Sequence, residues 1–462
     1  MRDNMKEWIF SLADAAAPAI GAANDALWEF AEPALKEVQS SGYLKAVLKE
    51  HGFRILPGAK GVPTSFVAEY GSGSPVIGLI AEYDALAGMS QDKIPLCRPY
   101  REGAPGHACG HCTLGAAVLG AALVLKDCMR RQSLPGTLRF YGCPAEETVE
   151  GKVLMSRDRL FDGCDAALSW HPNDVSYVWA RKSVALTSMR YTFHGTSAHA
   201  GLDPWNGRSA LDAVELMNVG ANYMREHIQP SCRLHYTITD GGKAPNIVPD
   251  RAQVWYVMRG PDRRAVEEVR LRLGKVAQGA ALMTGTGWEE EYISGCYDFL
   301  PNMTLARLLL SKMREVGAPR WTPEDRAFAC ELSRQIPQRC LEETRASFEL
   351  KDSDMTDGLV NGIYDGFYHG GSLGASTDLG DVSWQIPVGC FSFASTVVGA
   401  PGHSWFYTAA CGAGPGARGA QAAAKVLALS GYELLTDAGL REQAKQEHIS
   451  ALGGARYICP LE

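Results

Sequence analysis

The chain has 462 residues, of which 46% are hydrophobic and 21% charged, and its formal net charge is −7. This length exceeds what one compact core usually supports, so we expect at least two domains of an ordinary soluble globular protein. The modest negative charge gives no reason to expect nucleic-acid binding, and the polar N-terminus MRDNMKEWIF lacks a signal-peptide pattern.

The first part of the chain, residues 1–182, alternates helical and strand patterns. A helix is expected over Ala22–Leu48, and short apolar runs at Val76–Ile80, Thr137–Tyr141 and Ala166–Ser169 are typical of buried strands. An Ala- and Gly-rich helix should follow His111. This alternation predicts an α/β sheet covered on both faces.

The middle part, residues 183–295, has a different order of elements. Strands are expected near residues 189–193, 234–238, 253–259 and 288–293, and helices over 209–225 and 263–283. The order β-α-β-β-α-β is that of a ferredoxin-like unit. We therefore expect an inserted α+β domain, and the outer parts, 1–182 and 296–462, should form one catalytic domain.

The third part begins with a helix near Leu305–Val316 and has a strand near Val388–Ala394. Between them, Thr322–Ser376 is a long polar stretch, and loops of that length are usually functional or poorly ordered. The chain ends with a helix at Ala417–Leu429 and a second, charged helical segment. The longest apolar run, Leu114–Leu125, is about half a membrane span, so we expect a buried helix and no membrane association.

Five side chains spread along the outer parts are of the kinds that bind borderline divalent metals. They are Cys109 and His111 in GHACGH, Glu147 in PAEE, His171 in SWHP and His403 in APGHSW. Five ligands exceed the need of one tetrahedral ion, so two ions per chain are predicted. Zinc suits this set, and manganese and cobalt fit it as well. Glu146 is then the candidate to activate a water, which predicts a hydrolase.

Each of these residues also has a plainer interpretation. Taken alone, Cys109 is best explained as a buried small hydrophobic residue, and His171 as a loop histidine with satisfied hydrogen bonds. Glu146 and Glu147 also fit a solvated pair of acids at the start of a helix, where negative charge is favoured. Because all of these residues occur in one chain, a metal site is favoured over the separate plainer interpretations. His51, His227 and His448 look like surface residues without a role.

The motifs GHACGH, PAEE, SWHP, HGTSAHA, GGKAPNIVPD and APGHSW, in this order and at these spacings, resemble the metal-dependent aminoacylase and carboxypeptidase superfamily. Within this superfamily, the chain most resembles the B subunits of the aminobenzoyl-glutamate hydrolases. The auxin-conjugate amidohydrolases are a related branch. The resemblance covers nearly the whole chain. It implies a zinc-peptidase-like α/β catalytic domain with an inserted ferredoxin-like lid that dimerises.

The resemblance also implies roles for single residues. The five ligands match those of the family, and Glu146 matches its general base. His199, in SAHA, matches a lid histidine that reaches the partner subunit's site and polarises the substrate carbonyl. Asn246 and Arg259 match lid residues that hold the substrate carboxylate.

Two positions depart from the pattern. The residue after His111 is often Asp in the auxin-conjugate branch and is Cys112 here, and a thiol cannot replace a carboxylate as an acceptor. Many relatives have a His-x-Asp metal motif where this chain has Glu82-Tyr83-Asp84. One histidine ligand is thereby lost, and Cys109 is the candidate to replace it. Asp84 is expected to orient a ligand histidine.

Together these patterns predict a dinuclear-metal amidohydrolase that cleaves N-acyl amino acids, with N-aroyl-glutamates such as p-aminobenzoyl-glutamate as candidates. The alternatives are a dipeptidase or aminopeptidase of the same fold, and a non-catalytic partner of a two-subunit enzyme. We expect a homodimer through the inserted domain, with a heteromeric partner left open. The thirteen cysteines, an odd number without a compact disulfide framework, predict reduced thiols and a cytoplasmic location.

Overall fold

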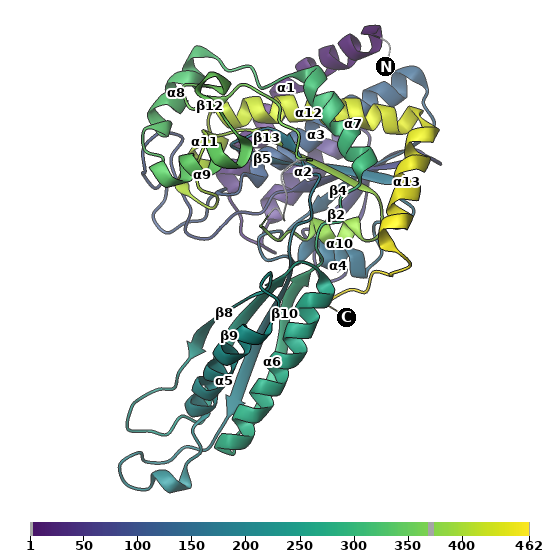
Figure 1. The fold of residues 1–462 in the computed structure, drawn as a ribbon. Helices are drawn as coiled ribbons and strands as arrows, with labels where there is room; N and C mark the ends of the chain where they lie inside the picture. Colours follow the sequence, from purple (N-terminus) through teal and green to yellow (C-terminus); the bar gives the residue numbers. More distant parts are fainter. Residues whose placement is uncertain (1–2, 368–373, 462) are drawn as a thin grey trace. The chain divides into compact units, whose positions relative to one another are not determined.

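A computed structural model describes residues 3–367 and 374–461 and divides them into two compact units (Figure 1). Unit 1 comprises residues 3–181, 300–367 and 382–459, and unit 2 comprises residues 182–299, 374–381 and 460–461. The chain therefore leaves unit 1, builds most of unit 2 and returns. The domain limits expected from the sequence remain predictions.

Unit 1 is built on a seven-stranded sheet of order β1-β2-β4-β3-β5-β13-β6. The strands are β1 (Arg54–Pro57), β2 (Phe66–Ser72), β3 (Val76–Glu82), β4 (Gly136–Cys143), β5 (Ala166–Asn173), β6 (Tyr177–Val178) and β13 (Val388–Ala394). The four consecutive strands β4, β3, β5 and β13 run parallel to one another, whereas β1, β2 and β6 pair antiparallel. Every residue of β13 is buried, as expected for a sheet covered on both faces.

Helix α3 (His111–Gln132) is the apolar segment that the sequence predicted to be buried. It is long and apolar enough to cross a membrane, but 89% of its apolar window is buried inside the protein. It packs against α1, α12 and strand β3. Its alanines and glycines allow these neighbours to approach closely, so α3 is a core helix.

The other helices of unit 1 are α1 (Asp3–Phe30), α2 (Val38–Glu50), α4 (Gly151–Arg157), α7 (Met303–Val316), α8 (Pro323–Ser333), α9 (Gln338–Phe348), α11 (Trp405–Cys411), α12 (Gly414–Thr436) and α13 (Ala438–Leu452). The predicted helix Ala22–Leu48 was wrong as one element. The chain turns between α1 and α2, where Ala31 and Leu35 have positive φ angles of 42° and 62° and Pro33 intervenes. These conformations cannot continue a helix.

The polar stretch 322–376 also differs from the expectation of a long loop. It contains α8 and α9 and a hairpin of β11 (Met355–Thr356) with β12 (Leu359–Val360). Helix α8 begins with a capping box in which Thr322 and Asp325 bond each other's backbone N–H groups. Residues 368–373 lie outside the described residues.

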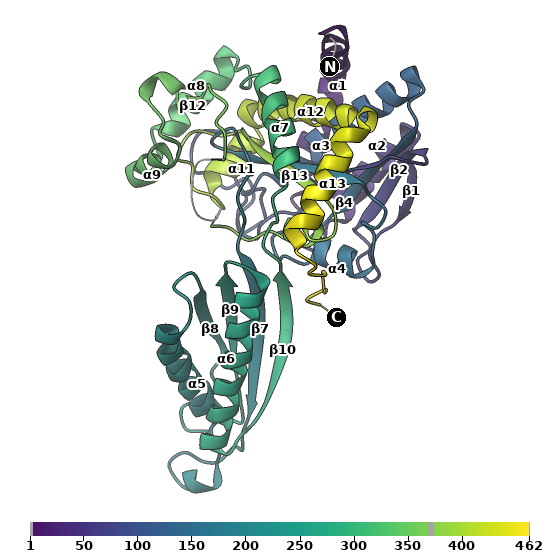
Figure 2. The same ribbon diagram turned by 45° about the vertical axis from the view of Figure 1, so that its right-hand side comes forward.

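Unit 2 has the predicted β-α-β-β-α-β order. Its elements are β7 (Ala185–His194), α5 (Ala210–Met224), β8 (Arg233–Asp240), β9 (Arg251–Gly260), α6 (Arg263–Thr284) and β10 (Gly287–Cys296). The antiparallel sheet has the order β10-β7-β9-β8, and α5 and α6 pack side by side along it (Figure 2). Alternate residues of β9 are buried against the helices, as period-2 patterning requires. The ferredoxin-like prediction is confirmed. Helix α10 (Leu379–Ser383) begins in unit 2 and ends in unit 1.

Candidate metal centre

Neighbouring parallel strands of unit 1 bring the five predicted ligands and Glu146 toward one edge of the sheet. β3 ends at Glu82, β4 ends shortly before Glu146 and Glu147, and β5 carries His171 near its end. Carboxyl ends of adjacent parallel strands meet at one edge, where sites of open α/β sheets form. His171 therefore lies within a strand, whereas the sequence placed it just beyond one.

Gly110 allows Cys109 and His111 to approach strand β5. Its φ angle is +81°, which side-chain-bearing residues rarely adopt, and an added Cβ would lie 2.6 Å from Cγ of Pro172 and 2.9 Å from Sγ of Cys411. Because glycine avoids both conflicts, α3 starts directly beside the strand that carries His171. The Cys-Gly-His spacing thus has a steric reason.

Asp84 connects two of the candidate ligands. Its Oδ1 lies 2.8 Å from Nδ1 of His111, and its Oδ2 accepts the backbone N–H of Glu147 at 2.9 Å. A carboxylate on Nδ1 fixes the ring and leaves the Nε2 lone pair for a metal. Nε2 of His111 is fully buried and has no hydrogen-bond partner among the described residues. This arrangement is what a metal-ligating histidine needs.

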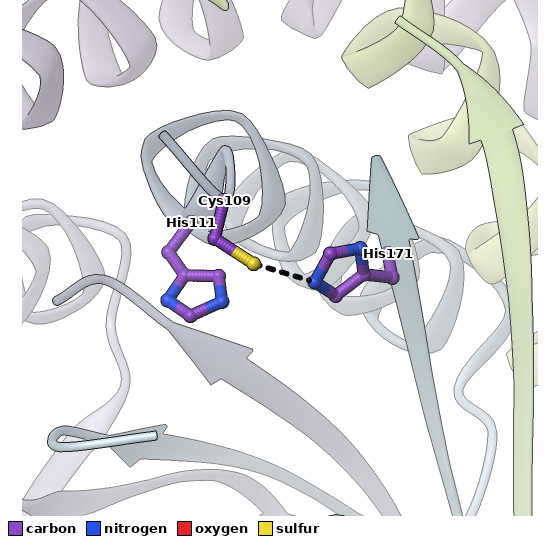
Figure 3. Close-up of side chains that lie close together, drawn as sticks. All are labelled: Cys109, His111 and His171. Carbon is purple, nitrogen blue, oxygen red and sulfur yellow. Dashed lines mark hydrogen bonds between the residues drawn. The ribbon is translucent and has the colours of Figure 1, made fainter. Parts of the chain in front are cut away.

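Cys109 and His171 face each other, with Sγ and Nε2 3.3 Å apart (Figure 3). Nδ1 of His171 is bonded to the backbone oxygen of Pro172 at 2.8 Å, so Nε2 carries the lone pair. Two ligands about 2.0–2.3 Å from one tetrahedral ion lie roughly 3.3–3.7 Å apart. The thiol and the imidazole therefore already have the spacing of two ligands of one ion.

His403 and Glu147 show the same spacing. Nε2 of His403 lies 3.4 Å from Oε2 of Glu147. The side chain of His403 is 57% exposed, whereas that of Glu147 is 6% exposed. His403 has a positive φ of 53°, a strained conformation for this residue, in the turn before α11. His403 is thus the exposed member of this pair and Glu147 the buried one.

Three groups of side chains have ligand atoms within 4.8 Å of one another. They are Cys109–His111–His171, Cys109–Glu147–His403 and Glu82–His111–Glu146. The first two groups contain all five predicted ligands and share Cys109, so the structure brings the predicted set together. Cys112 is fully buried and belongs to none of these groups. The donors of the first two groups, sulfur, imidazole and carboxylate, suit zinc-like ions.

Burial and crowding of charge shift the titration of this site. Burial and the charge of Glu82 raise the pKa of Glu146 to about 8, and burial raises the pKa of Glu147 to about 7. Burial lowers the pKa of His171 to about 4. Burial alone would also lower the pKa of His111, but Cys109 and Asp84 raise it above the ordinary value. Such displaced pKa values are frequent at functional sites.

The sequence did not reveal two buried acids that hold the ligand loops. Oε1 of Glu37 accepts the N–H of Ala145 at 2.9 Å, where the backbone has a positive φ of 56°. Oδ2 of Asp174 accepts the N–H of Gly399, also at 2.9 Å. Burial raises their pKa values to about 7 and about 6. No local pattern marks them, because their partners are more than a hundred residues away.

His199 and Asn246 lie on adjacent segments of unit 2, where Ala200 N–H donates to the Asn246 carbonyl at 3.0 Å. Both side chains are exposed. Arg259 lies near the end of β9 and donates to Oγ of Ser376 at 3.0 Å. The roles of these three residues remain predictions. His448, expected at the surface, is buried, and its Nε2 lies 2.9 Å from the Ser383 carbonyl oxygen.

Relatives span almost the whole chain. In Escherichia coli, the B component of p-aminobenzoyl-glutamate hydrolase is 37% identical over 95% of this chain and 93% of its own. Xaa-Arg dipeptidase of Mus musculus is 25% identical over 94% and 90%. A family model described as the peptidase dimerisation domain matches residues 182–281.

Solved structures share the fold. An aminobenzoyl-glutamate utilization protein from Klebsiella pneumoniae aligns with a TM-score of 0.61, covering 91% of this chain and 97% of its own at 15% identity. A dinuclear metal-binding peptidase of the M20 family from Bacillus subtilis aligns with a TM-score of 0.55, covering 90% and 99% at 18% identity.

Proposed function

The chain belongs to the M20 family of metal-dependent aminoacylases and carboxypeptidases, and from this membership we propose that it hydrolyses the amide bond of N-acyl amino acids at a dinuclear metal centre. The observation that carries the proposal is the pair of ligand groups that share Cys109, with the acid Glu146 beside them. N-aroyl-glutamates such as p-aminobenzoyl-glutamate are the proposed substrates, because of the likeness to the Escherichia coli hydrolase.

In the proposed reaction, Cys109, His111 and His171 would hold one divalent ion, and Cys109, Glu147 and His403 would hold the other. A metal centre built from these residues would supply an acidified water and a charge that polarises the amide carbonyl. Glu146 takes the proton of the attacking water and delivers it to the departing nitrogen. Its buried position favours proton uptake, in keeping with its raised pKa.

His199 is suited to donate a hydrogen bond. Its Nδ1 accepts the backbone N–H groups of Gly201 and Leu202, each at 3.1 Å. The neutral ring therefore carries its proton on Nε2, on an exposed side chain. We propose that Nε2–H stabilises the oxyanion that forms on the substrate carbonyl, in the site of a partner subunit. Asn246 and Arg259 are proposed to hold the substrate carboxylate, the latter by a charge-assisted contact.

A homodimer through unit 2 is proposed on the properties of its surface. Leu216, Val219 and Tyr223 are 36%, 50% and 77% exposed and recur on one face of α5. Strand β8 is at the edge of the sheet, with one side free of strand pairing among the described residues, and Ile238 on it is 43% exposed. An apolar helix face beside an open strand edge is suited to pairing with a second copy.

The same surface of unit 2 is also suited to pairing with a second type of subunit. The A and B components of the Escherichia coli hydrolase are 28% and 37% identical to this chain over 55% and 95% of its length. The Glu146 carboxyl and all five ligands are present, which supports an active enzyme and not only a structural partner. None of the thirteen cysteines forms a disulfide in the structure, in keeping with the proposed cytoplasmic location.

The proposal is tested by turnover of matched substrates after removal of metal and reloading with Zn²⁺, Mn²⁺ or Co²⁺. N-acetyl-glutamate, p-aminobenzoyl-glutamate and a dipeptide with a free α-amine separate the acyl-amino-acid hydrolase from a peptidase. We expect release of the amino acid from the N-acylated compounds only with metal. Cleavage of the dipeptide alone would favour the peptidase, and no turnover with two ions bound would favour the non-catalytic partner.

A further inference from the structure

Glu82 and Lys152 form a buried ion pair beside the candidate ligand His111. Nζ of Lys152 lies 2.8 Å from Oε1 of Glu82, and the side chains of Lys152 and Glu82 are 0% and 4% exposed. Glu82 is the last residue of β3, and Lys152 lies in the first turn of α4, just after the Glu146–Glu147 loop. Removing two charges from water is costly, and an apolar pair of equal volume would often be at least as stable. The pair therefore calls for a functional reason.

The second oxygen of Glu82 is directed at a candidate ligand. Oε2 lies 3.4 Å from Nε2 of His111, the buried nitrogen that has no hydrogen-bond partner among the described residues. Nδ1 of the same ring is taken by Asp84. The lone pair of Nε2 and a carboxylate oxygen thus face the same small volume, from which solvent is excluded.

The distance between these atoms is the one expected of two ligands of one ion. It equals the 3.4 Å between His403 Nε2 and Glu147 Oε2, and Cys109 Sγ to His171 Nε2 is 3.3 Å. A tetrahedral ion places an oxygen and a nitrogen ligand about 3.3–3.5 Å apart. Glu82 thus stands toward His111 as Glu147 stands toward His403.

We propose that Glu82 is a sixth protein ligand, binding through Oε2 the ion held by Nε2 of His111. Its nearest group contains His111 and Glu146 but not Cys109 or His171, so Oε2 of Glu82 would have to move toward those two ligands to share their ion. Lys152 keeps Oε1, which makes Glu82 monodentate and balances its charge. This inference rests on the proposed metal centre and concerns the residues that form it.

The consequence is an asymmetric pair of sites. With Cys109, His111, His171 and Glu82, one ion would have four protein ligands and no open position, as in structural zinc sites. The other ion, with Cys109, Glu147 and His403, would have three protein ligands and keep a position for water or substrate, as in catalytic sites. The Glu in Glu-Tyr-Asp would thus replace, in function, the histidine that this chain lacks in that motif.

The test uses the full chain loaded with one equivalent of Co²⁺, compared between wild type, Glu82→Gln and the double variant Glu82→Gln/Lys152→Met. The double variant removes both charges and leaves no uncompensated buried lysine. We expect it to bind the first equivalent more than ~100-fold more weakly, beyond the ~10- to 100-fold cost of losing an outer hydrogen-bonding partner. Azide should leave the wild-type cobalt spectrum unchanged and shift that of both variants, because a position is opened.

Two outcomes would overturn the inference. One is first-equivalent affinity in the double variant within tenfold of wild type. The other is azide sensitivity that is the same in wild type and variants, which would make Glu82 a positioning residue or an element of the fold. Lys49→Met/Glu50→Gln, the same two changes at exposed neighbouring positions, is the control and should retain both equivalents. Wild type that binds no metal would instead refute the proposed function, before any variant is measured.

Discussion

In unit 1 the candidate ligands other than His403 are buried or half-buried, and His111 is held by a long-range contact, whereas His199 of unit 2 is exposed and held locally. His111 is 0% exposed and bonded to Asp84, which lies 27 residues earlier in the chain. His199 is exposed and fixed by N–H groups only two and three residues away. Leu202 and Trp205, in the same loop, are 71% and 72% exposed. The candidate metal centre is preorganised by the fold, whereas the His199 loop has exposed apolar side chains and is held only by local contacts.

The largest effect is expected at the base. Glu146→Gln retains the shape of the side chain but cannot accept a proton, so kcat should fall by ~100- to 10,000-fold. Because Glu146 is not among the proposed ligands, metal content measured by elemental analysis should remain that of the wild type. Activity near that of the wild type would exclude Glu146 as the base and direct attention to Asp84.

His199→Ala should lower kcat by roughly 100- to 1,000-fold, the usual cost of one oxyanion donor. If the residue acts across a dimer, co-expressing His199→Ala with Glu146→Gln should restore activity, because one of the two sites in each hybrid has both groups. His194→Ala, at another exposed histidine of unit 2, is the matched control. Lack of recovery in purified hybrids would place His199 in the site of its own chain or in the lid alone.

Asp84→Ala tests whether Asp84 holds the candidate ligands His111 and Glu147 in position before a metal binds. The change removes the acceptors for the His111 ring and for the Glu147 N–H, so metal should bind ~10- to 100-fold more weakly. Competition with a chromophoric chelator gives the dissociation constants. Unfolding of the metal-free variant is measured in parallel. An unchanged affinity would mean that the ligands keep their places without Asp84.

The smallest effect concerns Glu37, whose burial raises its pKa from 4.5 to about 7. A raised pKa in the folded state means that folding is favoured by the protonated form, so its contribution is present below pH 4.5 and is lost as the pH rises to about 7. Glu37→Gln should flatten this decline of the unfolding free energy in metal-free protein, by at most about 1.4 kcal/mol per pH unit. The exposed Glu50→Gln is the control, and denaturant unfolding at several pH values is the measurement. The same decline in both variants would contradict the assignment.

Much of the architecture followed from local patterns. Period-2 alternation and amphipathic helices located every element of unit 2 from β7 to β10, because one face of each packs on a shared core. The short apolar runs located β3, β4, β5 and β13 of unit 1. Strand β1 at the edge of the sheet and its neighbour β2 were missed, since they are partly exposed and carry weaker patterns. The turn between α1 and α2 was missed because the apolar pattern continues through it.

The sequence by itself determined the types of ligand and the family, because the ligand residues and the motifs around them occur in short contiguous segments. Only the tertiary structure decided which ligands meet: that Cys109 is common to two groups, that Glu37 holds the N–H of Ala145 across 108 positions, and that Glu82 faces His111. These contacts arise when strands distant in sequence become neighbours in one sheet. The spacing of residues within a segment does not predict which strands pair. The geometry of these contacts therefore comes only from the folded chain.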